Sequence, residues 1–133
     1  MLNIDLTKEN YTFDELVQLV AFLTGENGCP WDKVQTHKSI RGNMLEEAGE
    51  AIEAIDSGDI ESLKEELGDV LLQSVLHSDI AKRAGEFDIN GVISVLCRKI
   101  IDRHTHVFGN DKAATAEEAV EFWKKAKKEK TKK

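Results

Sequence analysis

The chain has 133 residues and a net charge of −7, which leaves room for one hydrophobic core and predicts a single domain spanning residues 1–133. No apolar run approaches the roughly 20 residues of a membrane-spanning helix, and the first residues lack the basic start and apolar stretch of a signal peptide. Residues 124–133 carry seven Lys and one Glu, so the rest of the chain has a charge of −13, which would repel a polynucleotide. We therefore expect a cytoplasmic protein without membrane or nucleic-acid partners, and with Cys29 and Cys97 as reduced thiols.

Apolar residues recur at helical spacing along most of the chain, and cap signals separate the helical stretches. Thr12 with Glu15 forms a capping box at the start of the first helix, and Asp59 is suited to capping the third. Gly58 and Gly85 are suited to ending the second and third helices. The predicted helices cover residues 13–24, 37–56, 59–84, 89–103 and the stretch from the capping box of Thr115 and Glu118 into a frayed basic tail at 124–133, with a loop at 25–32. The sequence thus predicts an all-α fold, a bundle of about five helices.

The third predicted helix is apolar on two sides. Leu63, Leu67 and Leu71 share the face with which an amphipathic helix packs on its own domain. Leu72 and Leu76 lie on the opposite side, where such a helix meets water. A helix that is apolar on both sides is buried on both sides, and about five helices offer little further cover. We therefore expect a homodimer, with a tetramer as the alternative, in which a second subunit covers Leu72 and Leu76.

Two pairs of carboxylates occur on the second and third predicted helices. Glu47 and Glu50 are three residues apart, as are Glu66 and Asp69, so the members of each pair share a helix face. Both pairs lie roughly 14 Å from the turn at 57–58, at a rise of about 1.5 Å per residue. At about 100° per residue, Glu47 and Glu66 also fall on the same side of their apolar stripes. The four carboxylates are therefore expected to converge beside the seam of an antiparallel helix pair.

Four converging carboxylates are suited to a divalent cation, because without one they would repel each other and raise each other's pKa. Solvated acidic helix faces are common, but two pairs matched in height and phase favour a metal site. An all-oxygen ligand set favours Mg²⁺, with Mn²⁺ as the alternative, over zinc. A di-iron bundle would need a His three residues after a Glu, which neither pair has. His77 is expected to be a core residue or to lie behind the ligands without binding the metal.

The acidic pattern EExxE…ExxD resembles the signature of the MazG superfamily; here it consists of Glu46, Glu47 and Glu50, then Glu66 and Asp69. The segments CPWDKVQTHKSI (29–40), EELGDVLLQSVLH (65–77) and RHTHVFGN (103–110) are similar to MazG segments in the family's order, and the resemblance spans residues 13–128. It implies an α-helical dimer that hydrolyses nucleoside triphosphates between the α- and β-phosphates, in nucleotide-pool housekeeping. It also implies that the metal is held by Glu47, Glu50, Glu66 and Asp69.

The resemblance further suggests which residues contact the substrate. Lys99 and Arg103 match a basic pair of the family and would bind the triphosphate; the alternative is a surface pair on an acidic protein. Trp31 and Trp123 either stack on the base or pack in the core or an interface. His37 either lines the substrate pocket or is structural.

Glu46 and Glu47 are the candidate catalytic residues. Glu46 either accepts a proton from the attacking water, beside Glu47 at the metal, or is a solvated side chain. Two other functions remain as alternatives to the hydrolase: a non-catalytic α-helical interaction module that keeps the MazG-like fold, and a di-iron bundle. Four clustered acids argue against the first, since a non-catalytic module gains nothing from their repulsion. The missing His argues against the second.

Overall fold

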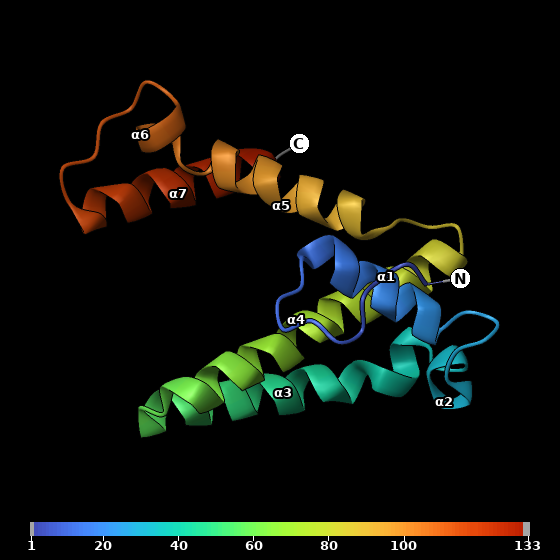
Figure 1. Ribbon diagram of the computed structural model, residues 1–133. Helices are drawn as coiled ribbons and strands as arrows, with labels where there is room; N and C mark the ends of the chain where they lie inside the picture. Colours follow the sequence, from blue (N-terminus) through green and yellow to red (C-terminus); the bar gives the residue numbers. More distant parts are fainter. Residues whose placement is uncertain (1, 132–133) are drawn as a thin grey trace. The chain divides into compact units, whose positions relative to one another are not determined.

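All the regular secondary structure of the described residues, 2–131, is helical in the computed structural model (Figure 1). This confirms the predicted all-α fold. Five long helices lie where the sequence predicts them: α1 (Phe13–Leu23), α3 (His37–Ser57), α4 (Ile60–Arg83), α5 (Ile89–Asp102) and α7 (Ala116–Thr131). The last two residues of the basic tail, 132–133, lie outside the described residues.

Two further helices, α2 (Pro30–Lys33) and α6 (Thr105–Phe108), consist of a single turn each. Pro30 occupies the first helical position of α2, where its fixed φ suits a helix and its missing N–H has no intrahelical partner to lose. The predicted loop at 25–32 was therefore wrong for its last three residues. One turn is too short to show helical periodicity, which explains why the sequence pattern does not reveal either helix.

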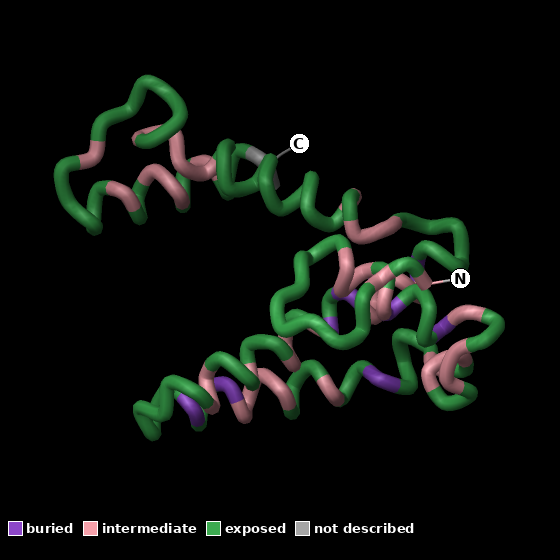
Figure 2. The backbone as a smooth tube through the Cα atoms, in the orientation of Figure 1, coloured by how far each residue is buried: buried purple, intermediate pink, exposed green. Residues whose placement is uncertain are grey.

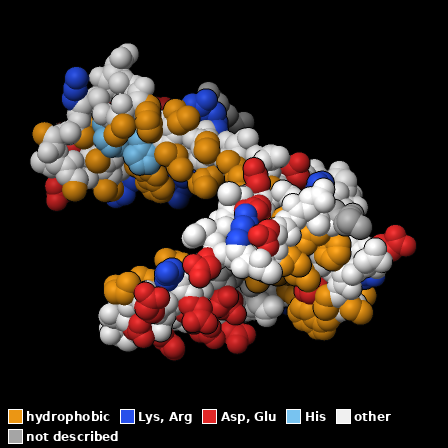
Figure 3. All heavy atoms as spheres, viewed as in Figure 1, with side chains coloured by type: hydrophobic (Ala, Val, Ile, Leu, Met, Phe, Trp, Pro, Cys, Tyr) orange, Lys and Arg blue, Asp and Glu red, His pale blue; other side chains and the backbone are white. Residues whose placement is uncertain are grey.

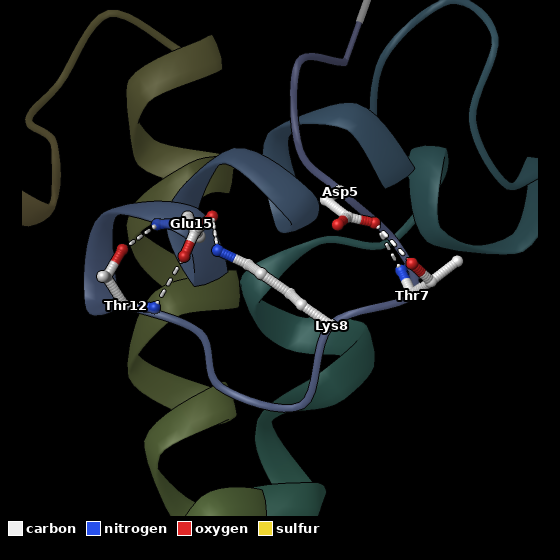
Figure 4. A network of polar contacts seen from close by, with 5 residues as sticks. All are labelled: Asp5, Thr7, Lys8, Thr12 and Glu15. Atoms are coloured by element: carbon white, nitrogen blue, oxygen red, sulfur yellow. Dashed lines mark hydrogen bonds and ion pairs between the residues drawn. The ribbon is translucent and has the colours of Figure 1, made fainter.

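The first helix begins at the predicted capping box. The N–H of Glu15 donates to Thr12 Oγ1 at 3.2 Å, and the N–H of Thr12 donates to Glu15 Oε1 at 2.9 Å (Figure 4). Lys8 forms an ion pair with Glu15, and the hydrogen bond with Lys8 is the main reason why the pKa of Glu15 lies below its usual value. Asp5 accepts hydrogen bonds from Thr7 in the same segment. The N-terminal segment is thus tied to the first turn of α1.

A tight turn joins α3 to α4. Gly58 ends α3 with a φ of 72°, the left-handed conformation that glycine adopts without strain. Asp59 then caps α4, because its Oδ1 accepts a hydrogen bond from the N–H of Ser62 at 3.2 Å. The predicted caps are therefore confirmed at this turn. They fix the register of α3 relative to α4.

The described chain forms two compact units. The first, up to Ile89, contains α1 to α4; α3 and α4 pack as an antiparallel pair and α1 lies against α4 (Figure 1). Its largest fully buried side chains are those of Ile40, Val20 and Val75. The second unit, from Asn90, contains α5, α6 and α7, with α6 against α7. The single domain over residues 1–133 stays a prediction.

Both cysteines are free, as expected, with Cys29 half-buried and Cys97 exposed. Among the described helices, none combines the length and the apolar character needed to cross a membrane.

Much of the α3–α4 pair is exposed (Figure 2). The exposed residues include large apolar ones. Leu45 of α3 is 81% exposed, and Leu67 of α4 is 53% exposed, with Leu71 exposed one turn later. Leu72 and Leu76 are instead half-buried and line a pocket within the first unit. The expectation that Leu67 and Leu71 pack on the chain's own helices was therefore wrong, because both are exposed. The chain's own helices cover part of Leu72 and Leu76, and the cover of these two residues by a second subunit stays a prediction. Periodicity shows that α4 is apolar on two sides, but it does not show which side packs on the chain's own helices.

Candidate active site

The α3–α4 pair brings the four predicted metal ligands together. Glu47 and Glu50 of α3 and Glu66 and Asp69 of α4 each offer one carboxylate oxygen, and these four oxygens lie within 4.8 Å of one another. Acidic side chains gather over the same pair of helices (Figure 3). The convergence follows from the register set at Gly58, because equal chain lengths on either side of the turn place the two pairs at the same height.

The pKa values of two of these carboxyls are raised. For Glu66 the pKa is raised to about 7, first by removal from water and then by hydrogen bonding to, and repulsion from, Glu50. The pKa of Glu47 is raised by removal from water, followed by repulsion from Glu50 and Asp69. The cluster therefore disfavours the charged forms of its own members, and a partner that favours those forms would relieve this cost.

The donor atoms of the cluster fit a divalent cation. The Oε2 atoms of Glu47 and Glu66 are shielded from solvent and have no hydrogen-bond partner within the described part of the chain. Every candidate ligand atom in the group is a carboxylate oxygen, the type that Mg²⁺ and Mn²⁺ prefer. No His belongs to the group found in the described residues, which is consistent with the sequence argument against a di-iron site.

Glu46, the second candidate catalytic residue, is exposed on α3 directly before Glu47. Its charge contributes to the raised pKa of Glu47, so the two side chains interact electrostatically. The exposure suits a residue that exchanges protons with water, and it equally suits a solvated side chain. The catalytic role of Glu46 stays a prediction.

A pocket of about 250 Å³ lies beside the cluster, within the first unit. Glu47 and Trp31 both line it, although they come from different helices and are 16 residues apart in the sequence. Leu72, Leu76 and Ile40 supply apolar wall. The pocket thus combines an aromatic ring, an apolar surface and an acidic edge, as a site for a flat, partly apolar ligand requires.

His37 takes part in a contact that the sequence did not predict. Its Nδ1 lies 2.7 Å from Nδ1 of His77, and the two rings are stacked with centroids 5.0 Å apart. Its Nε2 lies 4.0 Å from a carboxylate oxygen of Glu86. Burial, and then repulsion from His37, lower the pKa of His77. The two histidines are 40 residues apart in the sequence, which leaves no local signal for this pair. A substrate contact for His37 stays a prediction.

The second unit brings Arg103 and Trp123 together. The guanidinium carbon of Arg103 lies 5.2 Å from the Trp123 ring centroid, and Nζ of Lys127 lies 5.1 Å from the same centroid. Nε of Arg103 is shielded from solvent and has no hydrogen-bond partner among the described residues. Lys99 is exposed one turn before Arg103. Trp123 therefore contacts two cationic side chains by its ring face, an interaction that no pattern in the sequence indicates.

The comparisons with known proteins agree on one family. The model of the MazG nucleotide pyrophosphohydrolase domain matches residues 35–108, a stretch that includes all four carboxylates of the cluster. A Thermotoga maritima protein named nucleoside triphosphate pyrophosphohydrolase/pyrophosphatase MazG is 50% identical over 98 residues, which are 74% of this chain and 38% of that protein. An Escherichia coli K12 protein named nucleoside triphosphate pyrophosphohydrolase is 40% identical over 104 residues, 78% of this chain and 40% of that protein.

The chain spans about two fifths of the length of these two relatives. A solved structure, that of a MazG-related protein from Thermotoga maritima, matches with a TM-score of 0.71 and 28% identity. That match covers 86% of this chain and 98% of the solved one. Since the family model covers more than half of the sequence, the chain belongs to the MazG nucleotide pyrophosphohydrolase family.

Proposed function

We propose that this chain hydrolyses nucleoside triphosphates between the α- and β-phosphates, releasing nucleoside monophosphate and pyrophosphate, in nucleotide-pool housekeeping. The observation that carries the proposal is the cluster of Glu47, Glu50, Glu66 and Asp69 beside an aromatic-lined pocket. Relatives that match this part of the chain are named for the same activity. The chain spans only part of those relatives, but the matched part contains the cluster.

The four carboxylates are proposed to hold Mg²⁺, with Mn²⁺ as the alternative. Their oxygen-only donors and the unpartnered Oε2 atoms of Glu47 and Glu66 support this assignment. When bound, the cation supplies charge neutralisation for the phosphates. Because the pKa of Glu66 is about 7, a proton on that carboxyl competes with the cation below neutral pH. Glu46 is proposed to accept the proton of the attacking water, since it is exposed and adjacent in sequence to the cluster.

The base of the nucleotide is proposed to enter the pocket beside Glu47 and stack on Trp31. An exposed indole at a pocket lined by apolar side chains presents the face that a base needs. The phosphates are proposed to contact Lys99 and Arg103, whose cationic groups suit a triphosphate. Trp123 then acts on the substrate through Arg103, because the ring holds that guanidinium in place.

The assembly is proposed to be a homodimer, with a tetramer as the alternative. The support is the apolar surface that the α3–α4 pair leaves exposed, which includes Leu45, Leu67 and Leu71. Large apolar side chains that gather on a surface are costly to leave in water, and a second copy of the chain would cover them.

The activity is tested with nucleoside triphosphates, the purified chain and added inorganic pyrophosphatase, which converts released pyrophosphate into detectable phosphate. Turnover is expected with Mg²⁺ and not with EDTA, and ³¹P NMR should show monophosphate and pyrophosphate when pyrophosphatase is left out. Nucleoside diphosphate and orthophosphate as products would contradict the proposed bond cleavage. Triphosphates left intact under every metal condition would instead favour the non-catalytic α-helical module.

A further inference from the structure

Gln73 of α4 holds a buried acceptor in the wall of the pocket beside the carboxylate cluster. The residue is 6% exposed, and its Oε1 is shielded from solvent without a hydrogen-bond partner in the described chain. The same residue lines the pocket together with Trp31 and Glu47. Buried polar atoms in folded proteins are nearly always paired, because an unpaired one loses its hydrogen bonds to water. An unpaired acceptor on a side chain that lines a pocket therefore points to a donor on the ligand. Because Oε1 itself has almost no accessible surface in the empty pocket, the donor would meet it after the Gln73 side chain turns toward the pocket.

A long hydrogen bond to the residue one turn earlier favours one orientation of the Gln73 carboxamide. Its Nε2 donates to the backbone carbonyl oxygen of Asp69 at 3.4 Å. Turning the amide over would place its oxygen against that carbonyl oxygen, and two acceptors repel each other. The group left unpaired is therefore an acceptor and not a donor. The bond also ties Gln73 to the backbone of one of the clustered carboxylates.

Two other polar side chains of the pocket, those of Gln35 and Arg83, have partners within the chain. Nε2 of Gln35 donates to the carbonyl oxygen of Trp31 at 2.8 Å, and its Oε1 accepts from Ser39 Oγ at 2.8 Å. Nε of Arg83 donates to Asp79 Oδ2 at 3.1 Å. Apart from Glu47, which belongs to the carboxylate cluster, Gln73 is the lining residue in the described chain with a buried side-chain atom lacking a partner.

The size of the pocket limits which ligand could reach Oε1 of Gln73. At about 250 Å³ it is smaller than the roughly 300–1,000 Å³ of sites for drug-sized ligands. It suits a single flat ring system, with the remainder of a larger ligand outside. A nucleobase has this shape, and its edge carries either an amino group or a carbonyl group at the exocyclic positions.

We propose that Gln73 is a specificity-determining residue that selects nucleotides whose base carries an exocyclic amino group. An amino hydrogen donates to Oε1 of Gln73, whereas a hydrogen atom or a carbonyl oxygen at that place leaves the acceptor unpaired. A site built to make one hydrogen bond rejects the analogue that lacks the donor. This inference rests on the proposed function, since it names the class of base that the same site takes.

The test compares nucleotides that differ at the exocyclic group. ATP is paired with purine riboside triphosphate, in which hydrogen replaces the amino group, and CTP is paired with UTP. Wild type is expected to favour the amino-bearing member of at least one pair by about tenfold or more in kcat/KM. In Gln73→Met, which keeps the length but removes the acceptor, that ratio should fall to about one. A purely structural role of Gln73 would lower both members of a pair equally.

Ser78→Ala is the matched control. Ser78 is a buried polar residue of the same helix that does not line the pocket, and its hydroxyl donates to the carbonyl oxygen of Ser74 at 2.7 Å. This variant should keep the wild-type ratio. If Gln73→Met does not fold by circular dichroism, Gln73→Asn withdraws the acceptor by one methylene and should lose the preference in the same way.

Equal kcat/KM for both members of both pairs in wild type would overturn the inference while leaving the proposed function intact. Retention of the wild-type ratio in the folded Gln73 variant would overturn it as well. If wild type hydrolyses no nucleotide, the proposed function fails, and isothermal titration of the same pairs decides the role of Gln73. Tighter binding of the amino-bearing member that disappears in the variant would then support the inference, and equal affinities would overturn it.

Discussion

The charged residues of α7 and those of the α3–α4 pair occupy different parts of their helices. Glu117 and Glu118 lie in the first turn of α7, and its Lys residues lie toward the other end. This arrangement complements the helix dipole, which favours acids at the start and bases at the end. Lys127 additionally lies over the ring of Trp123. Helix electrostatics and aromatic contacts thus account for the charge pattern of α7 without a ligand.

Neither the helix dipole nor aromatic contacts explain the acidic cluster of the α3–α4 pair. Glu47, Glu50, Glu66 and Asp69 lie in the middle of long helices, where the dipole offers no stabilisation, and they crowd within 4.8 Å. The raised pKa values of Glu47 and Glu66 show that the cluster opposes its own ionisation. Charge at a helix end therefore has a structural explanation, whereas the like charge gathered in mid-helix is explained by the proposed cation.

The largest expected effect comes from removing one charge of the cluster. Glu50→Gln should lower kcat/KM of pyrophosphate release by more than about 100-fold, because the ligand set loses a negative charge with little change of shape. Coupled phosphate detection at saturating Mg²⁺ measures the loss. Glu65→Gln, an exposed Glu of α4 outside the cluster, is the matched control and should stay near wild type. Wild-type activity of Glu50→Gln would contradict the claim that the mid-helix carboxylates, unlike the charges at the helix ends, have a catalytic function.

A second prediction concerns the apolar surface of the same pair of helices. Leu67→Lys combined with Leu71→Lys should raise the dissociation constant of the dimer by about 100-fold, because two charges enter an interface that excludes water. Multi-angle light scattering over a dilution series measures the shift. Val34→Lys places a charge at an exposed apolar residue outside α3 and α4 and should leave assembly unchanged. A wild-type chain that stays a folded monomer at every concentration would contradict the expected dimer.

A smaller effect is expected in the second unit. Arg103→Lys keeps the positive charge but loses the planar fork and its stacking on Trp123, so kcat/KM should fall about tenfold. The matched control is Arg98→Lys, since Arg98 is an exposed member of an ion pair with Asp102 on α5. Steady-state kinetics of the two variants separate a substrate contact from a surface charge. If Arg103→Lys and Arg98→Lys both keep wild-type activity, Arg103 does not contact the substrate and is a surface charge.

The smallest expected effect is a pH dependence of stability at His77. Its pKa lies below the usual 6.5, so the unfolded chain binds a proton more readily than the folded one, and stability should fall as the pH drops below about 6.5. His37 faces His77, and Glu86 faces His37 from the segment after α4. Thermal unfolding at pH 7.5 and pH 5.5 should therefore show a larger decrease for wild type than for His77→Gln. Identical decreases would mean that the histidine pair does not couple protonation to folding.

The parts of this molecule that the sequence predicted correctly depend on local spacing. Thr12 with Glu15, and Asp59 after Gly58, act within a few residues, so they place the helix ends. The convergence of the carboxylates was predictable for a related reason, because a short turn transmits its register to both helices over about three turns.

Other features depend on contacts between residues far apart in the chain, and no spacing reports them. The pairing of His37 with His77 and the packing side of Leu72 are set by how α1, α3 and α4 fit together. Gln73 is similar, since only the folded pocket shows that its acceptor lacks a partner. The single-turn helices α2 and α6 are too short for any periodic signal.

The claim that the clustered carboxylates form a metal site is tested most directly by thermal unfolding of wild type and Glu66→Gln at pH 8. At this pH, above the pKa of about 7, the Glu66 carboxylate is ionised and repels its neighbours. In EDTA the variant should therefore melt at a higher temperature than wild type, and excess Mg²⁺ should raise the wild-type midpoint more than that of the variant. A variant that melts lower than wild type in EDTA and gains as much from Mg²⁺ would contradict the account, because Glu66 would then belong to a structural network.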